Sequence, residues 1–408
     1  MIIRKDMPVF HEGIQVIQLT EEECGACHVY MEAQVFFPCS SKFILHRCAT
    51  AHGADRNNPG HRYLLCDINN GCSLETLTEE TGTTGPAVSP DGRYFYYFVD
   101  ETRLNGGRLI LKRIDFSVSR KAEVIMVLDS PLPGTSTIPS RIYSLSTISS
   151  DGCRIAISGF LGDGRTERAP WGLMVLDVEK GTVSVVKQGP EWINMHPQYC
   201  RSTDILHNRD IMIQENHGSS VEKDGSRKEL VSGDGADIHL IRDDGSNFRT
   251  FPWGRDGMEF CTGHECWRGR SDWAIASVWY RDNEDARLLE SRGIEGSGHA
   301  GLQTPGGKRN DLSRSFDKPG FGHFSTDIGG RLLVSDYFLR DIYIAKLGVE
   351  GKMAASDWTR IADSCSSRSK ASHIHPFLSP DGKKAFFNSD QTGVLQAYMI
   401  TGIENAGL

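Results

Sequence analysis

Several histidines have positions that suit metal binding or proton transfer. His373 and His375 are separated by one residue, in the sequence Ser-His-Ile-His-Pro-Phe. Side chains at i and i+2 of a β-strand project from the same face, so this pair predicts two ligands for one metal ion. His196, His264 and His323 stand at the predicted starts of three further strands. Because imidazoles bind metal ions and also exchange protons near neutral pH, these five residues are the first candidates for a site.

The elements that must position these histidines are short β-strands joined by turns. The segments 88–97 and 378–387 both contain Ser-Pro-Asp-Gly followed by an apolar run, and looser copies occupy residues 149–157 and 325–334. Proline presets φ for a turn, and Asp-Gly supplies a corner that tolerates a left-handed conformation. The apolar run after each turn predicts a strand that is buried on both faces.

These strand pairs recur along the whole chain. Their spacing of roughly 45 to 60 residues is typical of the blades of a propeller. The first strands of the blades are expected near residues 33, 86, 143, 197, 265, 323 and 375. We therefore predict an all-β fold, a seven-bladed β-propeller in which residues 1–408 form a single domain. The alternative is a two-sheet sandwich or two smaller β-domains.

The two ends of the chain are predicted to pair. The last blade lacks an outer strand after Tyr398–Ile400, and the segment Gln15–Leu19 precedes the first full blade. We expect this N-terminal strand to complete the last blade and close the ring, which removes an exposed sheet edge. The first strands of propeller blades converge on a central channel, so histidines at equivalent positions of different blades would meet there. A lone histidine at a strand start is commonly structural, but the recurrence favours a shared site.

Two stretches interrupt the repeat. Residues 215–236 are rich in Gly, Ser and charged side chains, and residues 283–319 are rich in Gly, Arg and Asp. Both are expected to be long surface excursions, and neither is predicted to link two domains.

Composition limits the classes of function. The net charge of −8 argues against a general nucleic-acid binder, although a local basic pocket could still bind an anionic substrate. No apolar run reaches the ~20 residues of a membrane span, and the N-terminal residues lack the apolar stretch of a secretory signal. We therefore expect a cytoplasmic protein, with secretion of a processed form as the alternative.

The cysteines suggest free thiols and not a disulfide scaffold. The chain has 11 of them, an odd number, and is long for a disulfide-stabilised fold. Cys24 and Cys27 have C-x-x-C spacing. That spacing could mark a redox pair or half of a zinc site, but no second C-x-x-C completes it, so two partly buried free thiols are expected.

Motifs around the histidines extend over nearly the whole chain. They are Cys27-His28-Val29-Tyr30, Asn194-Met195-His196-Pro197-Gln198-Tyr199-Cys200 with Ser202-Thr203-Asp204, Gly263-His264-Glu265-Cys266-Trp267, Gly322-His323-Phe324-Ser325 with Leu333-Val334-Ser335-Asp336, and His373-Ile374-His375-Pro376 before Ser379-Pro380-Asp381. In order and rough spacing these segments resemble the oligogalacturonate lyases. The resemblance implies a seven-bladed propeller, usually cytoplasmic, that cuts short acidic oligogalacturonides by β-elimination with a manganese-type ion.

The resemblance also implies roles for individual residues. His323, His373 and His375 match the family's metal ligands, and His264 matches its general base. The ion would be Mn²⁺, with Ca²⁺ or another divalent ion as the alternative.

Two positions depart from the family's pattern. Lys370 stands where the family has a glutamine, three residues before His373, and a protonated ammonium cannot ligate a metal ion. The family's uronate-supporting arginine has no counterpart in the strand Asp237-Ile238-His239. His239 or a neighbouring arginine could take its place, or the substrate could be a different uronate.

β-Elimination from a uronate removes a weakly acidic proton α to a carboxylate. The reaction therefore needs a metal ion on the carboxylate, held by neutral imidazoles, and a further imidazole as base. It also needs cations that bind the acidic sugar. Arg201 and Arg268, which follow His196 and His264 closely, are expected to assist catalysis. The residues expected to bind substrate are His196, Gln198, His239, Lys370, Arg47 and Arg62.

These features predict a metal-dependent polysaccharide lyase that acts on short uronate oligosaccharides and leaves 4,5-unsaturated products. Its partner would be an acidic oligosaccharide, not nucleic acid or a membrane, and the chain would be a monomer or a homodimer. A lyase for another uronate linkage, such as glucuronate in plant gums, is the alternative within this class. A non-catalytic propeller that scaffolds other proteins is the alternative from a different class, because a propeller fold alone does not imply an enzyme.

Overall fold

The computed structural model describes residues 2–53, 56–230, 235–253, 259–293, 309–348 and 358–408. These residues form β-strands and three short 3₁₀ helices, η1 (Ile68–Asn70), η2 (Lys370–Ser372) and η3 (Ile403–Ala406). In this part of the chain no helix is long and apolar enough to span a membrane.

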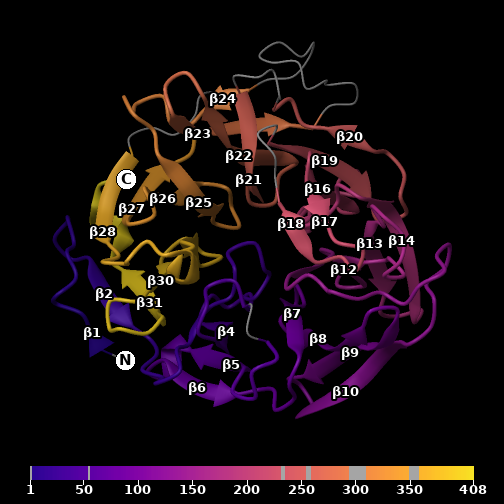
Figure 1. The fold of residues 1–408 in the computed structure, drawn as a ribbon. Coiled ribbons are helices and arrows are strands. Elements are labelled where there is room, and N and C mark those ends of the chain that lie inside the picture. Colours follow the sequence, from indigo (N-terminus) through magenta and orange to yellow (C-terminus); the bar gives the residue numbers. More distant parts are fainter. Residues whose placement is uncertain (1, 54–55, 231–234, 254–258, 294–308, 349–357) are drawn as a thin grey trace. The chain divides into compact units, whose positions relative to one another are not determined.

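The strands form successive antiparallel blades, of four strands each except the last, which has five (Figure 1). Blade 1 contains β3 (Cys27–His28), β4 (Lys42–Arg47), β5 (Arg62–Asp67) and β6 (Ser73–Thr76). Blade 2 contains β7 (Thr83–Val88), β8 (Tyr94–Arg103), β9 (Gly106–Asp115) and β10 (Ser119–Leu128). Blade 3 contains β11 (Ser146–Ile148), β12 (Arg154–Phe160), β13 (Trp171–Asp177) and β14 (Thr182–Gly189).

The second half of the chain continues the pattern. Blade 4 contains β15 (Gln198–Tyr199), β16 (Asp210–Asn216), β19 (Ala236–Arg242) and β20 (Arg249–Thr250). Blade 5 contains β21 (Glu259–Trp267), β22 (Trp273–Tyr280), β23 (Asp285–Arg292) and β24 (Asn310–Asp311). Blade 6 contains β25 (Phe321–Thr326), β26 (Leu332–Tyr337), β27 (Asp341–Lys346) and β28 (Trp358–Asp363). Blade 7 contains β29 (Phe377–Leu378), β30 (Ala385–Ser389), β31 (Gln396–Thr401), β2 (Gln15–Gln18) and β1 (Ile2–Ile3).

The chain divides into two compact units. Unit 1 comprises residues 1–81, 264–291 and 308–408, and it contains blades 1, 6 and 7 with most of blade 5. Unit 2 comprises residues 82–263 and 292–307, and it contains blades 2, 3 and 4. Ala236 pairs with Cys261 inside unit 2, which continues the sheet of blade 4 into the start of β21.

The Ser-Pro-Asp-Gly motif forms the turn between the first and second strands of a blade. In blade 2 the Ser89 hydroxyl accepts a hydrogen bond from the Tyr94 N–H at 2.8 Å, and the Asp91 carboxylate accepts one from the Arg93 N–H at 3.0 Å. Gly92 has a φ of 73°, which glycine adopts without strain. The same bonds recur in blades 3 and 7, at Ser149 and Asp151 and at Ser379 and Asp381.

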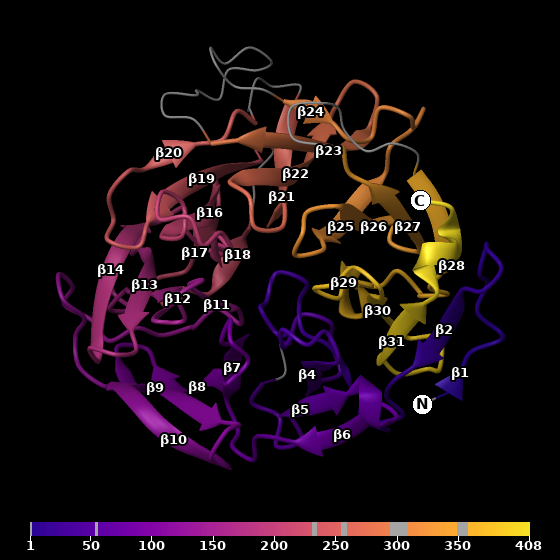
Figure 2. The same cartoon turned by 180° about the vertical axis from the view of Figure 1, so that it is seen from behind.

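The N-terminal strand completes the last blade, as predicted. Strand β2 pairs with β31, with Val16 opposite Ile400, and Figure 2 shows the two strands side by side. Both side chains lie in the apolar core that blade 7 shares with Val334 and Ile361 of blade 6. This pairing and the seven blades of the described residues, six with four strands and the last with five, confirm the predicted all-β propeller class.

Two boundary predictions need correction. Residues 285–292, which the sequence assigned to a surface excursion, form strand β23, and Leu288 and Leu289 in it are buried. Residues 294–308 of that excursion lie outside the described residues, and Asn310–Asp311 after them form strand β24. The first strand of blade 1 begins at Cys27 and not near residue 33. The composition hid both elements, because β23 alternates charged with apolar residues and β3 has only two residues.

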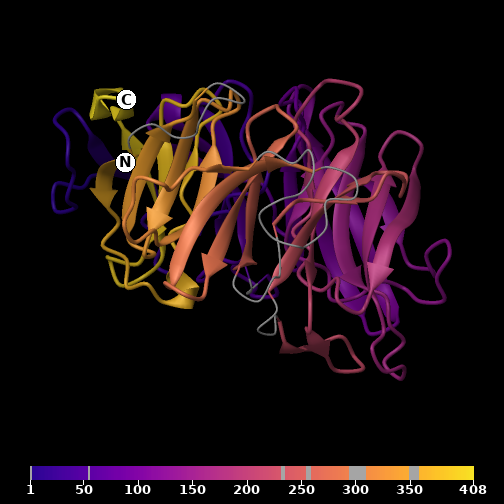
Figure 3. The same cartoon turned by 90° about the horizontal axis from the view of Figure 1, so that it is seen from above.

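The excursion at 215–236 contains a short hairpin in its described part. Strands β17 (Ser220–Val221) and β18 (Arg227–Glu229) pair with each other, and residues 231–234 lie outside the described part. In Figure 3 this hairpin extends beyond the ends of the blade strands of unit 2.

We expect the pairing of β2 with β31 to limit the stability of unit 1. Val16→Asp places a carboxylate in a core where Val16 is 1% exposed, and it should lower the free energy of unfolding by about 3–5 kcal/mol. Gln15→Asp, on the exposed face of the same strand, should change it by less than about 0.5 kcal/mol. Urea unfolding followed by tryptophan fluorescence measures both, and equal effects would contradict the prediction.

Candidate metal centre

Unit 1 brings together the histidines that the sequence singled out in blades 5, 6 and 7. His264 lies on β21, His323 lies on β25, and His373 and His375 lie between η2 and β29. The ring centroid of His323 is 4.4 Å from that of His264, 5.1 Å from that of His373 and 4.5 Å from that of His375. The first strands of blades 5 and 6 and the segment before the first strand of blade 7 therefore bring four imidazoles to one place.

The local geometry of the His-x-His pair differs from the prediction. His373 and His375 do not lie on a strand, and their rings are nearly perpendicular, with centroids 5.7 Å apart. His375 has a φ of 42°, in the left-handed region, and Pro376 follows it. Such a conformation costs about 1–3 kcal/mol for a non-glycine residue and is found mostly at functional sites. The pair converges because of this bend and not because of strand alternation.

His52 is a member of the cluster that the sequence analysis missed. It follows β4 in blade 1, and its ring centroid is 5.3 Å from that of His373 and 4.8 Å from that of His375. One ligand atom from each of these three residues lies within 4.8 Å of the others. His52 lies in the connection between β4 and β5. It therefore belongs to no repeated strand and to no recognisable motif, and the sequence did not single it out.

Asp336 on β26 fixes the orientation of His323. The His323 Nδ1–H donates to Asp336 Oδ2 at 2.7 Å, and Asp336 Oδ1 accepts from the backbone N–H groups of Gly322 and His323 at 3.0 and 3.2 Å. A Cβ at Gly322 would lie 2.7 Å from Asp336 Oδ1, so this position requires glycine. With the proton on Nδ1, the lone pair of a neutral His323 ring is on Nε2, which is the arrangement of a metal ligand with a carboxylate behind it.

Burial keeps the ligand histidines neutral. It lowers the pKa of His375 well below the ordinary value, and the neighbouring His323 and His52 lower it further. Burial also lowers the pKa of His373; the Lys370 ammonium adds to this effect, and Asp336 opposes it. Burial raises the pKa of Asp336 to about 7, against the effect of His264.

The donor set fits a divalent cation. Both ring nitrogens of His375 and Nδ1 of His373 are buried and have no hydrogen-bond partner among the described residues. Unsatisfied buried nitrogen atoms are costly, and coordination to a metal ion would satisfy them. Neutral imidazoles suit zinc, copper, iron and nickel, whereas manganese favours carboxylate, carbonyl and water ligands, so the residues fit a divalent cation without selecting the predicted ion.

Tyr30 forms a wall of the cluster. Its ring meets that of His375 edge-on with centroids 4.6 Å apart, and that of His323 at 6.2 Å. The sequence contained a signal for it, because Tyr30 ends the motif Cys27-His28-Val29-Tyr30 that resembles the opening blade of the lyases.

The remaining predicted histidines belong to unit 2. His196 precedes β15 and packs against Tyr143, with ring centroids 5.3 Å apart. It has a φ of 48° and is followed by proline, so it repeats at blade 4 the bend that His375 makes at blade 7. His239 on β19 contacts Thr250 Oγ1 at 2.9 Å through Nδ1 and Glu215 at 3.1 Å through Nε2.

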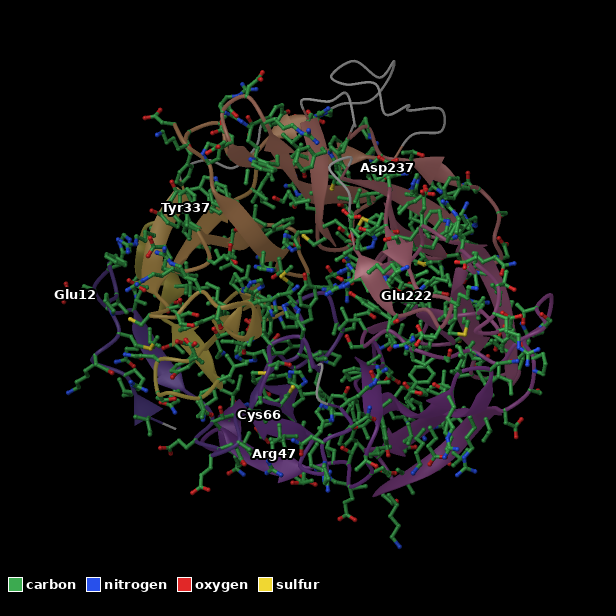
Figure 4. The ribbon with its side chains drawn as sticks, viewed as in Figure 1. Glu12, Arg47, Cys66, Glu222, Asp237 and Tyr337 are labelled. Carbon is green, nitrogen blue, oxygen red and sulfur yellow. The ribbon has the colours of Figure 1, made fainter. Side chains whose placement is uncertain are left out.

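Two more residues predicted for the site lie in the same region of unit 2. Gln198 is buried on β15, and Arg201 follows that strand half-buried. Figure 4 labels Asp237, at the start of β19, whose side chain contacts His217. Asp237 and the nearby Glu215 make this region acidic.

Several predicted cations have structural partners. Arg268 forms a buried ion pair with Glu290 and also donates to the Gly330 carbonyl at 3.1 Å. Arg47, labelled in Figure 4, pairs with Glu22 at 2.9 Å, and Arg62 donates to the His61 carbonyl at 2.6 Å. Lys370 begins η2, three residues before His373, so it lies closest in sequence to the histidine cluster.

Comparison with known proteins supports the fold. No protein-family model and no curated protein matches the sequence. The structure is similar to a solved oligogalacturonate lyase in complex with manganese, with a TM-score of 0.67 and 20% identity over 98% of this chain and 97% of that one. An oligogalacturonate lyase from Vibrio parahaemolyticus also has a TM-score of 0.67, with 17% identity over 98% and 97%. The β-propeller domain of the Trilobed protease from Pyrococcus furiosus has a TM-score of 0.50, with 11% identity over 92% and 94%.

These likenesses define the class of the protein as a β-propeller. Within that class, the two matched lyases share nearly the full length of the chain. The propeller domain of a protease shares the fold as well, so the fold by itself does not assign an activity.

We expect Asp336 to set the metal affinity of the cluster. In Asp336→Asn, an amide oxygen that keeps the two backbone N–H bonds turns its NH₂ group toward His323 Nδ1. The ring must then carry its proton on Nε2, which weakens coordination. Calorimetric titration with Mn²⁺ should show a loss of affinity of about 10–100-fold.

The matched control is Asp327→Asn, a buried carboxylate in the turn of the same blade that accepts from the Arg331 and Leu332 N–H groups. It should leave the Mn²⁺ affinity unchanged. An unchanged affinity in Asp336→Asn would contradict the assigned role.

Proposed function

We propose that this protein is a metal-dependent lyase that cleaves short, acidic uronate oligosaccharides by β-elimination. The observation that carries the proposal is the convergence of His264, His323, His373 and His375 inside one compact unit. The likeness to a lyase solved with manganese supports both the reaction class and the ion. The motifs around these histidines also resemble those of the oligogalacturonate lyases.

The metal ligands in this proposal are His323, His373 and His375, with His52 as a fourth imidazole. A bound divalent ion would supply a Lewis acid for the substrate carboxylate. The protein keeps the ligand rings neutral by burial, and Asp336 holds the proton of His323 on Nδ1.

His264 is the proposed base. Its ring lies beside that of His323. A uronate carboxylate directed at the ligand histidines would therefore bring its α-carbon near His264. His264 accepts the proton from C5, the C4–C5 double bond forms, and the bond from C4 to the glycosidic oxygen breaks. The leaving oxygen takes a proton from solvent, and the product is a 4,5-unsaturated uronate.

Cations are the second requirement for an acidic substrate. Lys370 is the strongest candidate, because it precedes the ligand pair and its charge acts on His373. His196, Gln198 and His239 remain predicted substrate contacts, and Arg201 remains a predicted catalytic residue. Arg47, Arg62 and Arg268 remain predictions, and the ion pair of Arg268 with Glu290 gives that residue a structural role as well.

The substrate linkage distinguishes two versions of the proposal. The resemblance to the oligogalacturonate lyases favours galacturonate oligomers as substrates. The two departures from the family's pattern, at Lys370 and in the strand containing Asp237, favour glucuronate-containing oligomers. A cytoplasmic location and a monomer or homodimer are proposed with either version. A scaffold propeller would need no buried, unsatisfied imidazoles, so the nitrogen atoms of His375 favour an enzyme.

The decisive experiment mixes the metal-supplemented protein with short oligogalacturonides and, separately, with glucuronate-containing oligomers. A lyase produces a rise in ultraviolet absorbance from the unsaturated product, which a chelator abolishes and Mn²⁺ restores. His264→Ala should lower kcat by at least about 100-fold and leave Mn²⁺ affinity unchanged. The matched control His11→Ala lies outside the cluster and should retain full activity. No absorbance change on any uronate, with a folded and metal-loaded protein, would reject the proposal.

Lys370→Gln tests the proposed substrate contact. Loss of a charge-assisted bond to a uronate should lower kcat/KM by about tenfold, mainly through KM. Lys383→Gln, an exposed lysine of blade 7, is the matched control and should have no effect. An unchanged KM in Lys370→Gln would remove this residue from the substrate site, and tighter Mn²⁺ binding would show that position 370 acts through the metal.

A further inference from the structure

Blade 1 contains a second cluster of metal-ligating side chains, apart from the histidines assigned to the proposed reaction. Cys27 lies on β3, His46 lies on β4, Cys48 directly follows β4, and His61 directly precedes β5. These four side chains are buried, with exposed fractions of 0–4%. Three neighbouring strands of one blade thus bring two thiols and two imidazoles to the same end of the blade.

The donor atoms converge. One ligand atom each of His46, Cys48 and His61 lies within 4.8 Å of the others. Cys27 Sγ lies 3.0 Å from His46 Nε2, and the rings of His46 and His61 have centroids 5.8 Å apart. Both thiols also face the Thr50 carbonyl oxygen, at 3.0 Å for Cys48 and 3.7 Å for Cys27. Three donors therefore converge, and the Cys27 thiol adjoins them through its contact with His46.

The spacing suits a tetrahedral ion. Zn²⁺ with bonds of about 2.3 Å to sulfur and 2.0–2.1 Å to nitrogen separates neighbouring donors by roughly 3.3–3.9 Å. The Cys27–His46 separation of 3.0 Å lies just below that range, and the ligand atoms of His46, Cys48 and His61 lie within 4.8 Å of one another, so the side chains must adjust to bind the ion. His46 Nε2 also lies 3.1 Å from the His28 carbonyl. Coordination through Nε2 would replace that contact and leave the ring proton on Nδ1.

Charge and burial also favour zinc. Two thiolates balance the charge of Zn²⁺, and two neutral imidazoles complete four ligands, so the buried complex has no net charge. Sulfur donors are soft ligands that select zinc over manganese or calcium. The all-histidine cluster has no thiolate and therefore a weaker preference for zinc, so the two sites differ in how firmly they would retain it.

We propose that Cys27, His46, Cys48 and His61 form a structural zinc site. It fixes the start of the connection between β4 and β5, the segment Cys48–Gly53, which contains His52. The Ala51 N–H also donates to the Ala371 carbonyl beside the His-x-His pair at 2.8 Å. A zinc ion at Cys48 therefore positions His52 against His373 and His375. The site is independent of the proposed lyase activity, because it requires only that the blade fold.

The first test uses the unmodified protein, purified without chelators. Elemental analysis should find zinc at about one equivalent per chain, and X-ray absorption at the zinc edge should show a mixed sulfur and nitrogen shell. A shell of nitrogen and oxygen only would overturn the proposal, because zinc would then occupy the histidine cluster. Absence of zinc together with no uptake of added Zn²⁺ by the reduced protein would also overturn it.

Variants separate the two sites. Cys48→Ser should lower zinc content at least about tenfold, whereas His375→Ala should retain zinc. The matched control is Cys66→Ala, a buried cysteine of the same blade that is labelled in Figure 4 and lies outside the cluster. Full zinc retention in Cys48→Ser would contradict the assignment.

Cobalt substitution gives a readout that does not depend on activity. Co²⁺ bound to thiolates absorbs through sulfur-to-metal charge transfer, and among the described residues the cysteine-containing metal group is this one. The band should appear in wild type and in His375→Ala and be weaker in Cys48→Ser. A disulfide between Cys27 and Cys48, seen as a mass lower by two hydrogens in the freshly purified protein, would instead show a redox pair and reject the zinc site.

Discussion

The bond between the Asp336 carboxylate and His323 is the interaction on which the candidate site depends. Asp336 is fully buried, and without three donors its charge would be too costly to keep there. Two donors are backbone N–H groups of β25 and the third is the imidazole, so the carboxylate is satisfied only when β25 holds His323 in this orientation. The requirement for glycine at position 322 follows from the same close approach.

The blade architecture explains how residues distant in sequence meet. Within unit 1, the first strands of blades 5 and 6 and the segment before the first strand of blade 7 place imidazoles next to one another. In blade 7, the tight Ser-Pro-Asp-Gly turn and the pairing of β2 with β31 hold the strands in register. Because the cost of the bend at His375 falls on the protein before any ligand binds, the rest of the blade must compensate for it.

The strand repeat and most residues of the histidine cluster could be predicted from the sequence. The residues and contacts that could not be predicted have physical reasons. Turn motifs and apolar runs have fixed periods, so the blades and the closing strand were predictable. His52 lies in a connection without a period, and Tyr30 was visible only through a motif. The pairing of Arg268 with Glu290 joins residues 22 positions apart, and sequence spacing alone does not specify such a partner. The division into two compact units left no trace in composition, because the blade pattern continues through it.

The two proposed clusters of unit 1 differ in ligand type, and ligand type would separate a reactive ion from a structural one. Neutral imidazoles leave the charge of a bound divalent ion uncompensated, so an anionic substrate is attracted to it. Two thiolates and two imidazoles would neutralise the ion and complete its coordination, so it would bind no further ligand. His52 connects them, since it lies four residues after Cys48 and beside His373 and His375. An ion that fixes Cys48 would therefore restrict where His52 can lie. Part of the conformational entropy lost in assembling the histidine cluster would then be lost when blade 1 folds, and not when substrate binds.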